Sequence, residues 1–163
     1  MAENKSELEF VELIKQNRNF IYKVCNAYAT DRYELADLYQ DVVLNLWESF
    51  PKYRKQSKIS TWIYRIALNT AISALHKQHF ETTLIPITSD MENLIDSTTE
   101  IKTQIVEMYA IIRQLNKLER ALIILWLDGI SYQEIAQILG ITRTNVATKL
   151  NRVKEKLAQM ANS

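Results

Sequence analysis

Apolar residues recur every three or four positions through most of the chain, which is the spacing of one face of an α-helix. The first stripe predicts a helix over residues 7–28. A second stripe follows Asp31, which has Glu34 three residues later, the spacing of a capping box. Pro51 prevents this helix from continuing far past residue 49. A third helix is expected to start near Ser60.

The C-terminal third shows the same spacing in shorter segments that are separated by turn residues. Asn116, Ser131 and Thr142 are placed to cap the starts of three helices, and Gly129 and Gly140 are placed to end two of them. The pattern predicts helices over about residues 100–115, 117–128, 132–139 and 143–160.

These elements predict an all-α protein of two small helical domains joined by a flexible linker. Residues 81–100 have no sustained periodicity and are rich in Ser and Thr, so we expect them to form the linker between domains at 1–80 and 101–163. The 163 residues include only two glycines and two prolines, which argues against a many-stranded sandwich or barrel.

Charge is distributed in blocks, although the net charge is only +1. Residues 49–80 hold six basic side chains and no acidic one, and residues 81–100 hold five acidic side chains and no basic one. Residues 129–163 are again basic, with five cations against two carboxylates. Positive blocks attract polyanions such as nucleic acids, and two solvated faces are the alternative interpretation.

Residues 131–149 have the pattern of a helix-turn-helix. A short capped helix is followed by Gly140, which can adopt the positive φ of the turn, and by a second capped helix. The N-terminal end of a recognition helix enters the major groove, where Arg and Asn can pair with base edges and Lys and Thr can hold phosphates. A plain helical hairpin is the alternative. The candidate DNA-contacting residues are Arg143, Thr144, Asn145, Thr148, Lys149 and Arg152.

The block from residue 52 to residue 78 combines cations with aromatic residues. Cations bind a phosphate backbone, and aromatic rings stack on bases that have left the duplex. The block therefore suggests contact with opened DNA. A large aromatic residue beside aliphatic ones is more often core, so we assign Trp62, and Trp47 before it, to the core and leave Tyr53 and Tyr64 open.

Other classes of function find little support in the sequence. The single Cys25 cannot form an intrachain disulfide, which suits a reducing cytosol. The polar N-terminus lacks a signal-peptide core, and no run is long enough to span a membrane. His76 and His79 could share a metal at i, i+3, but no further ligand lies close enough in sequence to complete a site. No phosphate loop or nucleophile motif indicates an enzyme.

Three segments together resemble the sigma factors of the bacterial extracytoplasmic-function group. Residues 37–47 read Asp-Leu-Tyr-Gln-Asp-Val-Val-Leu-Asn-Leu-Trp and resemble the second conserved region of that group. Residues 60–69 read Ser-Thr-Trp-Ile-Tyr-Arg-Ile-Ala-Leu-Asn and are similar to its promoter-melting segment. Residues 129–152 are similar to its fourth region. The resemblance extends over about residues 8–157.

The resemblance implies a promoter-specificity subunit of RNA polymerase that is not an enzyme, needs no cofactor and works in the cytoplasm. Its first domain would bind the clamp helices of the largest polymerase subunit and would recognise and melt the −10 element. Its second domain would dock on the polymerase flap and read the −35 element. The implied polymerase contacts are Asp37, Leu38, Gln40, Asp41 and Leu44, and the implied −10 contacts are Lys55, Lys58, Ser60, Thr61, Tyr64, Arg65 and Asn69.

The resemblance also implies an anti-sigma factor that holds the protein inactive by covering apolar surface meant for polymerase. Ser73, His76 and Ala147 depart from residues common in the family, which suggests an altered promoter sequence. The competing hypothesis is an ordinary helix-turn-helix regulator that binds DNA independently of core polymerase. It explains residues 100–160 equally well, but it does not explain the acidic face at residues 37–47 beside the basic, aromatic block.

Overall fold

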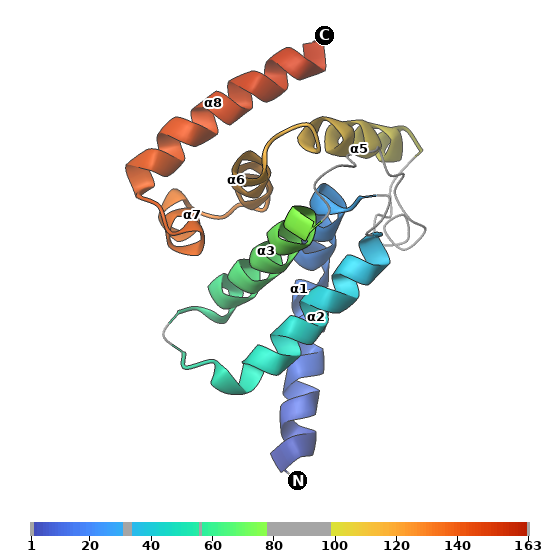
Figure 1. The fold of residues 1–163 in the computed structure, drawn as a ribbon, viewed down its shortest axis with the longest axis vertical. Coiled ribbons are helices and arrows are strands. Elements are labelled where there is room, and N and C mark those ends of the chain that lie inside the picture. Colours follow the sequence, from blue (N-terminus) through green and yellow to red (C-terminus); the bar gives the residue numbers. More distant parts are fainter. Residues whose placement is uncertain (1, 31–33, 56, 78–98, 163) are drawn as a thin grey trace.

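The computed structural model describes residues 2–30, 34–55, 57–77 and 99–162, and this part of the chain is helical without a strand (Figure 1). The all-α prediction is confirmed. The predicted linker lies outside the described residues except for residues 99 and 100, which begin a helix. The elements are α1 (Ala2–Tyr28), α2 (Leu35–Ser49), the 3-10 helix η1 (Phe50–Lys52), α3 (Ile59–Lys77), α5 (Thr99–Ile112), α6 (Lys117–Leu127), α7 (Tyr132–Leu139) and α8 (Arg143–Asn162).

The first three α-helices pack against one another around an apolar core. The stripe read from the sequence of α2 is buried, and α1 and α3 contribute the facing side chains. Near the N-terminal end of α1, the Phe10 ring lies 5.0 Å from the Trp47 ring and 5.6 Å from the Phe50 ring, measured between centroids. The fully buried residues of this core include Ile21, Val24, Leu38, Val42, Leu46, Ile63 and Ala67.

Two helix starts differ from the prediction. α2 begins at Leu35, with Glu34 as an N-cap residue that makes no side-chain capping bond. The proposed capping box is therefore wrong, because Glu34 precedes the helix rather than occupying its third position; Asp31 lies outside the described residues. α1 begins at Ala2 rather than near residue 7, because Glu, Lys and Leu favour helix even where no apolar stripe is present.

The predicted helix caps of the C-terminal half are confirmed. The Asn116 side chain accepts a hydrogen bond from the Glu119 amide, and the Glu119 carboxylate accepts one from the Asn116 amide. The Ser131 hydroxyl accepts from the Glu134 amide, and the Thr142 hydroxyl likewise caps α8. Both glycines adopt the positive φ that turns require: 79° at Gly129 and 71° at Gly140.

Helices α7 and α8 form the predicted helix-turn-helix. Ile135, Val146 and Leu150 are fully buried between them. Ala136 is partly buried, and its carbonyl accepts the hydrogen bonds of the Gly140 and Ile141 amides that close the turn. α6 packs against both of these helices. The side chains at the start of α8 are thereby fixed on a rigid support.

The two halves of the chain pack directly on each other. α3 lies against α7, and the C-terminal end of α1 lies against α5 and α6 (Figure 1). The Tyr28 hydroxyl donates a hydrogen bond to the Lys117 carbonyl at 2.6 Å. Burial raises the pKa of this phenol. The buried residues of both halves therefore form one continuous core.

Two buried arginines complete this contact. Arg113 donates from Nε to the Asn26 carbonyl at 3.0 Å and from Nη2 to the Asn26 side-chain oxygen. Arg120, only 5% exposed, donates to the carbonyls of Leu115, Arg113 and Ala27 at 2.8, 2.6 and 3.3 Å. Burial lowers the pKa of both guanidinium groups. Each arginine therefore ties the α5–α6 turn to the C-terminal end of α1.

Candidate nucleic-acid interface

The first two turns of α8 present a polar, exposed surface. Thr142 orders the first turn, and Thr148 donates a further hydrogen bond to the Thr144 carbonyl at 3.0 Å. A helix N-terminus in this position also attracts a phosphate through its free N–H groups. Among the six residues that we predict to contact −35 DNA, Lys149 is half-buried; the exposed ones are Arg143, Thr144, Asn145, Thr148 and Arg152.

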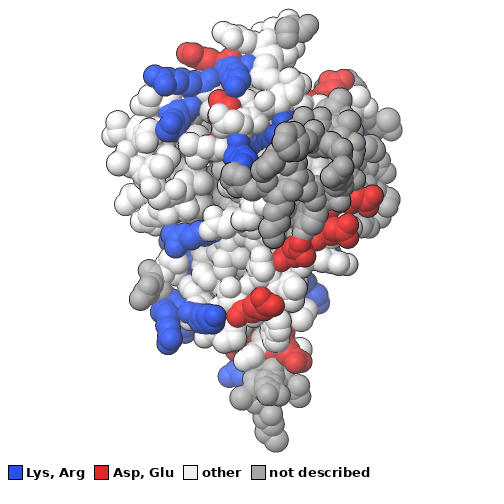
Figure 2. Space-filling model, viewed as in Figure 1, with Lys and Arg blue, Asp and Glu red and all other residues white. Residues whose placement is uncertain are grey.

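A second basic surface lies on the loop between η1 and α3. Lys55 has a positive φ of 58°, which is uncommon for a residue with a Cβ atom. The Tyr53 hydroxyl donates to the Ser57 carbonyl across the loop, and the Tyr53 ring lies 5.2 Å from the Trp62 ring. Figure 2 shows basic side chains in two groups, one over α8 and one near this loop. The exposed cations at the end of η1 and in this loop are Lys52, Arg54, Lys55 and Lys58.

Several of the predicted −10 contacts, on α3 and at the residue just before it, face the C-terminal half of the protein. The Lys58 ammonium lies 2.7 Å from the Glu134 carboxylate, and Arg65 donates to the Gln137 carbonyl at 2.9 Å. The Tyr64 hydroxyl lies 3.4 Å from the Asp128 carboxylate. Burial, followed by the nearby Asp128 charge, raises the pKa of Tyr64 to about 12, so its hydroxyl keeps its proton at neutral pH.

The remaining −10 candidates differ in exposure. Thr61 is buried, and Ser60 is partly buried at the start of α3. Asn69 is exposed two turns further along the helix. The structure therefore brings Lys55, Lys58, Arg65 and Asn69 to the surface of this segment, while Thr61 and Tyr64 lie within the packed interior.

The acidic face of α2 is exposed as its spacing predicts. Asp37, Gln40, Asp41 and Leu44 occur at i, i+3, i+4 and i+7 and are all exposed. Leu38 is fully buried, because it belongs to the opposite, core-facing stripe of the same helix. The Leu38 side chain therefore packs in the core beneath the exposed face and is not accessible to a partner in this structure.

The assignment of Trp47 to the core is wrong. Its side chain is 40% exposed and covers one edge of Phe10. Trp62 is partly buried and packs against the core, as we predicted.

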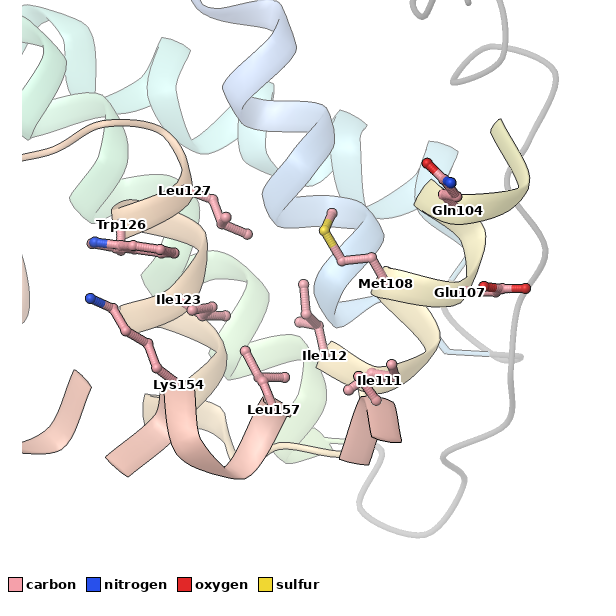
Figure 3. A pocket seen from close by; sticks show the side chains of 11 residues that line it. Gln104, Glu107, Met108, Ile111, Ile112, Ile123, Trp126, Leu127, Lys154 and Leu157 are labelled. Carbon is pink, nitrogen blue, oxygen red and sulfur yellow. The ribbon is translucent and has the colours of Figure 1, made fainter. Parts of the chain in front are cut away.

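An apolar groove lies between α5, α6 and α8 (Figure 3). It encloses about 510 Å³. The apolar stripe of α5 is covered only in part: Ile112 is buried and Ile105 is partly buried, whereas Ile101 and Met108 are exposed. The Lys154 ammonium lies 4.1 Å from the centre of the Trp126 ring at one edge of the groove. Large exposed apolar side chains in this part of the protein include Ile101, Val106, Met108, Trp126 and Leu127.

Sequence reasoning missed the groove and the acidic residues that face α3. Trp126 and Leu127 end a continuous apolar run, and such a run carries no periodicity that separates an exposed face from a buried one. The sequence places Asp128 and Glu134 at helix ends but does not indicate their ion pairs, because the partner residues are distant in sequence. The sequence pattern likewise did not indicate that Arg113 and Arg120 are buried.

The described part of the chain contains no cluster of three or more His, Cys, Asp or Glu side chains that could hold a metal ion. Neither His79 nor the side chain of His76 lies within the described part. Cys25 is buried, and burial raises the pKa of its thiol. Among the helices that the structure describes, none is long and apolar enough to cross a membrane.

Two stretches of the chain match known protein families. Residues 13–81, which include the C-terminal part of α1 and all of α2 and α3, match Sigma-70 region 2. Residues 105–157, which run from within α5 to within α8, match Sigma-70, region 4. The first match therefore lies in the N-terminal half of the chain and the second in the C-terminal half.

Individual relatives and structures agree with these matches. The ECF RNA polymerase sigma-E factor of Escherichia coli K12 is 29% identical over 141 residues, which cover 76% of this chain and 72% of the relative. The ECF RNA polymerase sigma factor SigW of Bacillus subtilis is 22% identical over 161 residues, which cover 91% of this chain and 86% of the relative. A solved structure of the sigma factor RpoE from Bartonella quintana, in complex with the anti-sigma factor NepR, has a similar fold. The TM-score is 0.74 and the sequence identity is 16%. The match covers 94% of this chain and 97% of that one.

Proposed function

Because this chain belongs to the sigma-70 family, as a sigma factor of the extracytoplasmic-function group, we propose that it binds core RNA polymerase, recognises −10 and −35 promoter elements and directs transcription initiation in the cytoplasm. The observation that carries this function is the presence of region 2 and region 4, in that order, in one chain. A regulator that binds DNA alone needs a helix-turn-helix but has no use for region 2. The role is one of recognition, and the polymerase supplies the catalysis.

The exposed surfaces support a division of labour between the two halves. α8 reads the −35 duplex through the polar side chains of its first turns, because these can reach base edges in the major groove. The basic loop and α3 bind the opened −10 strand, where cations hold phosphates. The exposed face of α2 binds the polymerase clamp through Asp37, Gln40, Asp41 and Leu44.

Run-off transcription with core polymerase and a promoter library tests the function directly. The parent protein is expected to confer start-site selection on the polymerase and to reveal its promoter preference. Replacing Asp41 with Arg is expected to weaken competition for core polymerase about five- to tenfold, since a charge reversal at an interface rim disturbs complementarity without burying a charge.

The Glu12→Arg variant is the matched control, because it reverses an exposed carboxylate on α1. Both variants should melt at the temperature of the parent. If the Asp41→Arg variant competes for core polymerase as well as the parent does, that result would count against the proposed α2 interface. A parent protein that never confers start-site selection would refute the function itself.

The apolar groove is a suitable binding surface for the polymerase flap. Large apolar side chains that are exposed close together, here Met108, Trp126 and Leu127, are typical of an interaction site. Covering it would also inactivate the protein, and we propose that an anti-sigma factor does so, by analogy with the complex that contains NepR.

Replacing Leu127 with Glu is expected to weaken binding to core polymerase about tenfold, because a carboxylate would have to be desolvated in the interface. Leu127 is exposed, so the fold should persist. Leu8→Glu is the control, since Leu8 is exposed on α1, far along the chain from the groove. Equal polymerase affinities for both variants, measured by fluorescence anisotropy, would exclude the groove from the interface.

A further inference from the structure

Tyr53 is a residue of the basic, aromatic block to which the proposed function gives no role. It is partly buried at the start of the basic loop, of which the structure describes residues 53–55, 57 and 58. Its hydroxyl donates a hydrogen bond to the Ser57 carbonyl, and its ring centroid lies 5.2 Å from that of Trp62. The Tyr53 side chain therefore joins the two ends of the loop to each other and to the first turn of α3.

The aromatic ring on which Tyr53 packs is itself held by other rings. The Trp62 ring lies 6.2 Å from the Phe50 ring, and the Phe50 ring lies 5.6 Å from the Phe10 ring. Aromatic pairs attract each other at centroid separations of about 4.5–7 Å. The Tyr53 amide also donates to the Phe50 carbonyl at 3.2 Å. Tyr53 is thus connected through a row of rings to the core of the N-terminal half.

The backbone of the loop adopts an uncommon conformation. Among the described residues other than glycine, Lys55 alone has a positive φ, which is 58°. A residue with a Cβ atom keeps such a conformation only where the surrounding structure enforces it. The hydrogen bond from Tyr53 to Ser57 closes the chain on both sides of Lys55, so it supplies a constraint of this kind.

A closed loop is better prepared to bind an anionic strand than an open one. Arg54 and Lys55 are both exposed in the loop. Ordering a loop and its side chains at an interface weakens binding, and a loop that is ordered in advance avoids part of this loss. The bond between Tyr53 and Ser57 therefore favours binding of phosphates by the cations between them.

Direct contact with DNA is the alternative role for Tyr53, because an aromatic ring can stack on an unpaired base. Such stacking needs only the ring and makes no use of the hydroxyl. Here the hydroxyl is bonded to the protein, and the ring packs against Trp62. The geometry therefore favours an indirect role, in which the hydroxyl acts on the loop.

We propose that Tyr53 is a positioning residue, whose hydroxyl holds the basic loop in the conformation that binds the −10 strand. This inference rests on the proposed function, because it concerns the DNA-binding role that we propose for Lys55. The ring keeps Tyr53 on α3, and the hydroxyl orders the loop.

The first test removes only the hydroxyl. Polymerase assembled with the Tyr53→Phe variant should bind a fluorescent single-stranded −10 oligonucleotide, taken from the promoter selected in the transcription experiment, about 3- to 10-fold more weakly than polymerase with the parent. Binding to a duplex that carries only the −35 element should change by less than about twofold. Tyr132→Phe removes a hydroxyl from a partly buried tyrosine on α7 and is the control, which should bind both DNAs as the parent does.

The comparison of the two DNAs separates positioning from a general structural role. A variant that is less folded, or that binds polymerase less well, would bind both DNAs more weakly and by the same factor. A positioning role weakens binding of the −10 strand alone. Tyr53→Phe should also compete for core polymerase as the parent does.

The second test asks whether Tyr53 acts through Lys55. Lys55→Asn removes the cation, and Asn adopts a positive φ more readily than most residues, so the loop can keep its conformation. In this background Tyr53→Phe should weaken −10 binding by less than about twofold, since the cation that Tyr53 positions is gone. A Tyr53 side chain that contacts DNA directly would show its full loss in both backgrounds.

The outcomes distinguish the positioning role from the proposed function. If Tyr53→Phe binds the −10 strand as tightly as the parent, or shows the same loss with Asn at position 55, the positioning role is overturned. Equal losses on the −10 strand and the −35 duplex would also overturn it. In each case the function stands as long as the parent directs initiation with polymerase. A parent that fails to direct initiation would overturn the function itself.

Discussion

Replacing Arg120 with Ala is expected to lower the free energy of unfolding by about 3–4 kcal/mol, one of the two largest effects that the structure predicts. The Arg120 guanidinium donates to three backbone carbonyls and lies 5.5 Å from the centre of the Tyr28 ring. Truncation leaves those acceptors buried without this donor, and each unsatisfied group costs about 1–3 kcal/mol. For a chain of this size the melting temperature should fall by roughly 6–15 °C.

Urea denaturation followed by circular dichroism measures this loss. Arg18→Ala is the matched control, because Arg18 is exposed on α1 and its truncation should change stability by no more than about 0.5 kcal/mol. Arg120→Lys should recover only part of the loss, since a single ammonium cannot reproduce the fork of donors that meets three carbonyls. Equal stability of Arg120→Ala and Arg18→Ala would contradict the role that we assign to this buried contact.

The second large effect concerns promoter recognition. Replacing Arg143 or Asn145 with Ala is expected to cost about 1–3 kcal/mol at a cognate −35 element, which is about 5- to 150-fold in affinity, and to relax base preference there. Both side chains are exposed at the start of α8, where a recognition helix meets base edges. The helix cap is made by the Thr142 hydroxyl and the Asn145 backbone amide, so the substitution at Asn145 leaves the cap intact.

Binding of the assembled polymerase to a promoter library gives this measurement, because it reports the preference at each position of the −35 element. Gln159→Ala, exposed near the other end of α8, provides the control and should behave as the parent. Transcription of every promoter by the Arg143 and Asn145 variants at the parent level would show that α8 is not the recognition helix.

Local interactions explain which parts of the fold can be read from the sequence. The caps at Asn116, Ser131 and Thr142 and the turns at Gly129 and Gly140 each depend on residues within a few positions of one another. The acidic face of α2 is equally local, because helical spacing alone brings its four exposed members to one side. Prediction failed at the start of α2, where Glu34 is the N-cap residue and not the third residue of the helix.

Contacts between distant residues explain what could not be predicted. The periodicity of apolar residues in α3 indicates one buried face of this helix. Tyr64 and Leu68 lie outside that face and are also buried. α7 packs on α3 as well. Trp47 lies at the edge of the N-terminal core, where its ring packs against Phe10 on one side and remains partly exposed. The pairing of Lys58 with Glu134 joins residues 76 positions apart, and no sequence pattern encodes such a distance.

The C-terminal end of α1 is completed by side chains from the other half of the molecule. The last carbonyls of a helix have no partners within it, and here Arg113 and Arg120 bond to those of Asn26 and Ala27. Removing the C-terminal half would return these groups to water and allow the final turn to fray. The two family regions are thus thermodynamically coupled through a shared helix terminus, so that folding of the first is strengthened by the presence of the second.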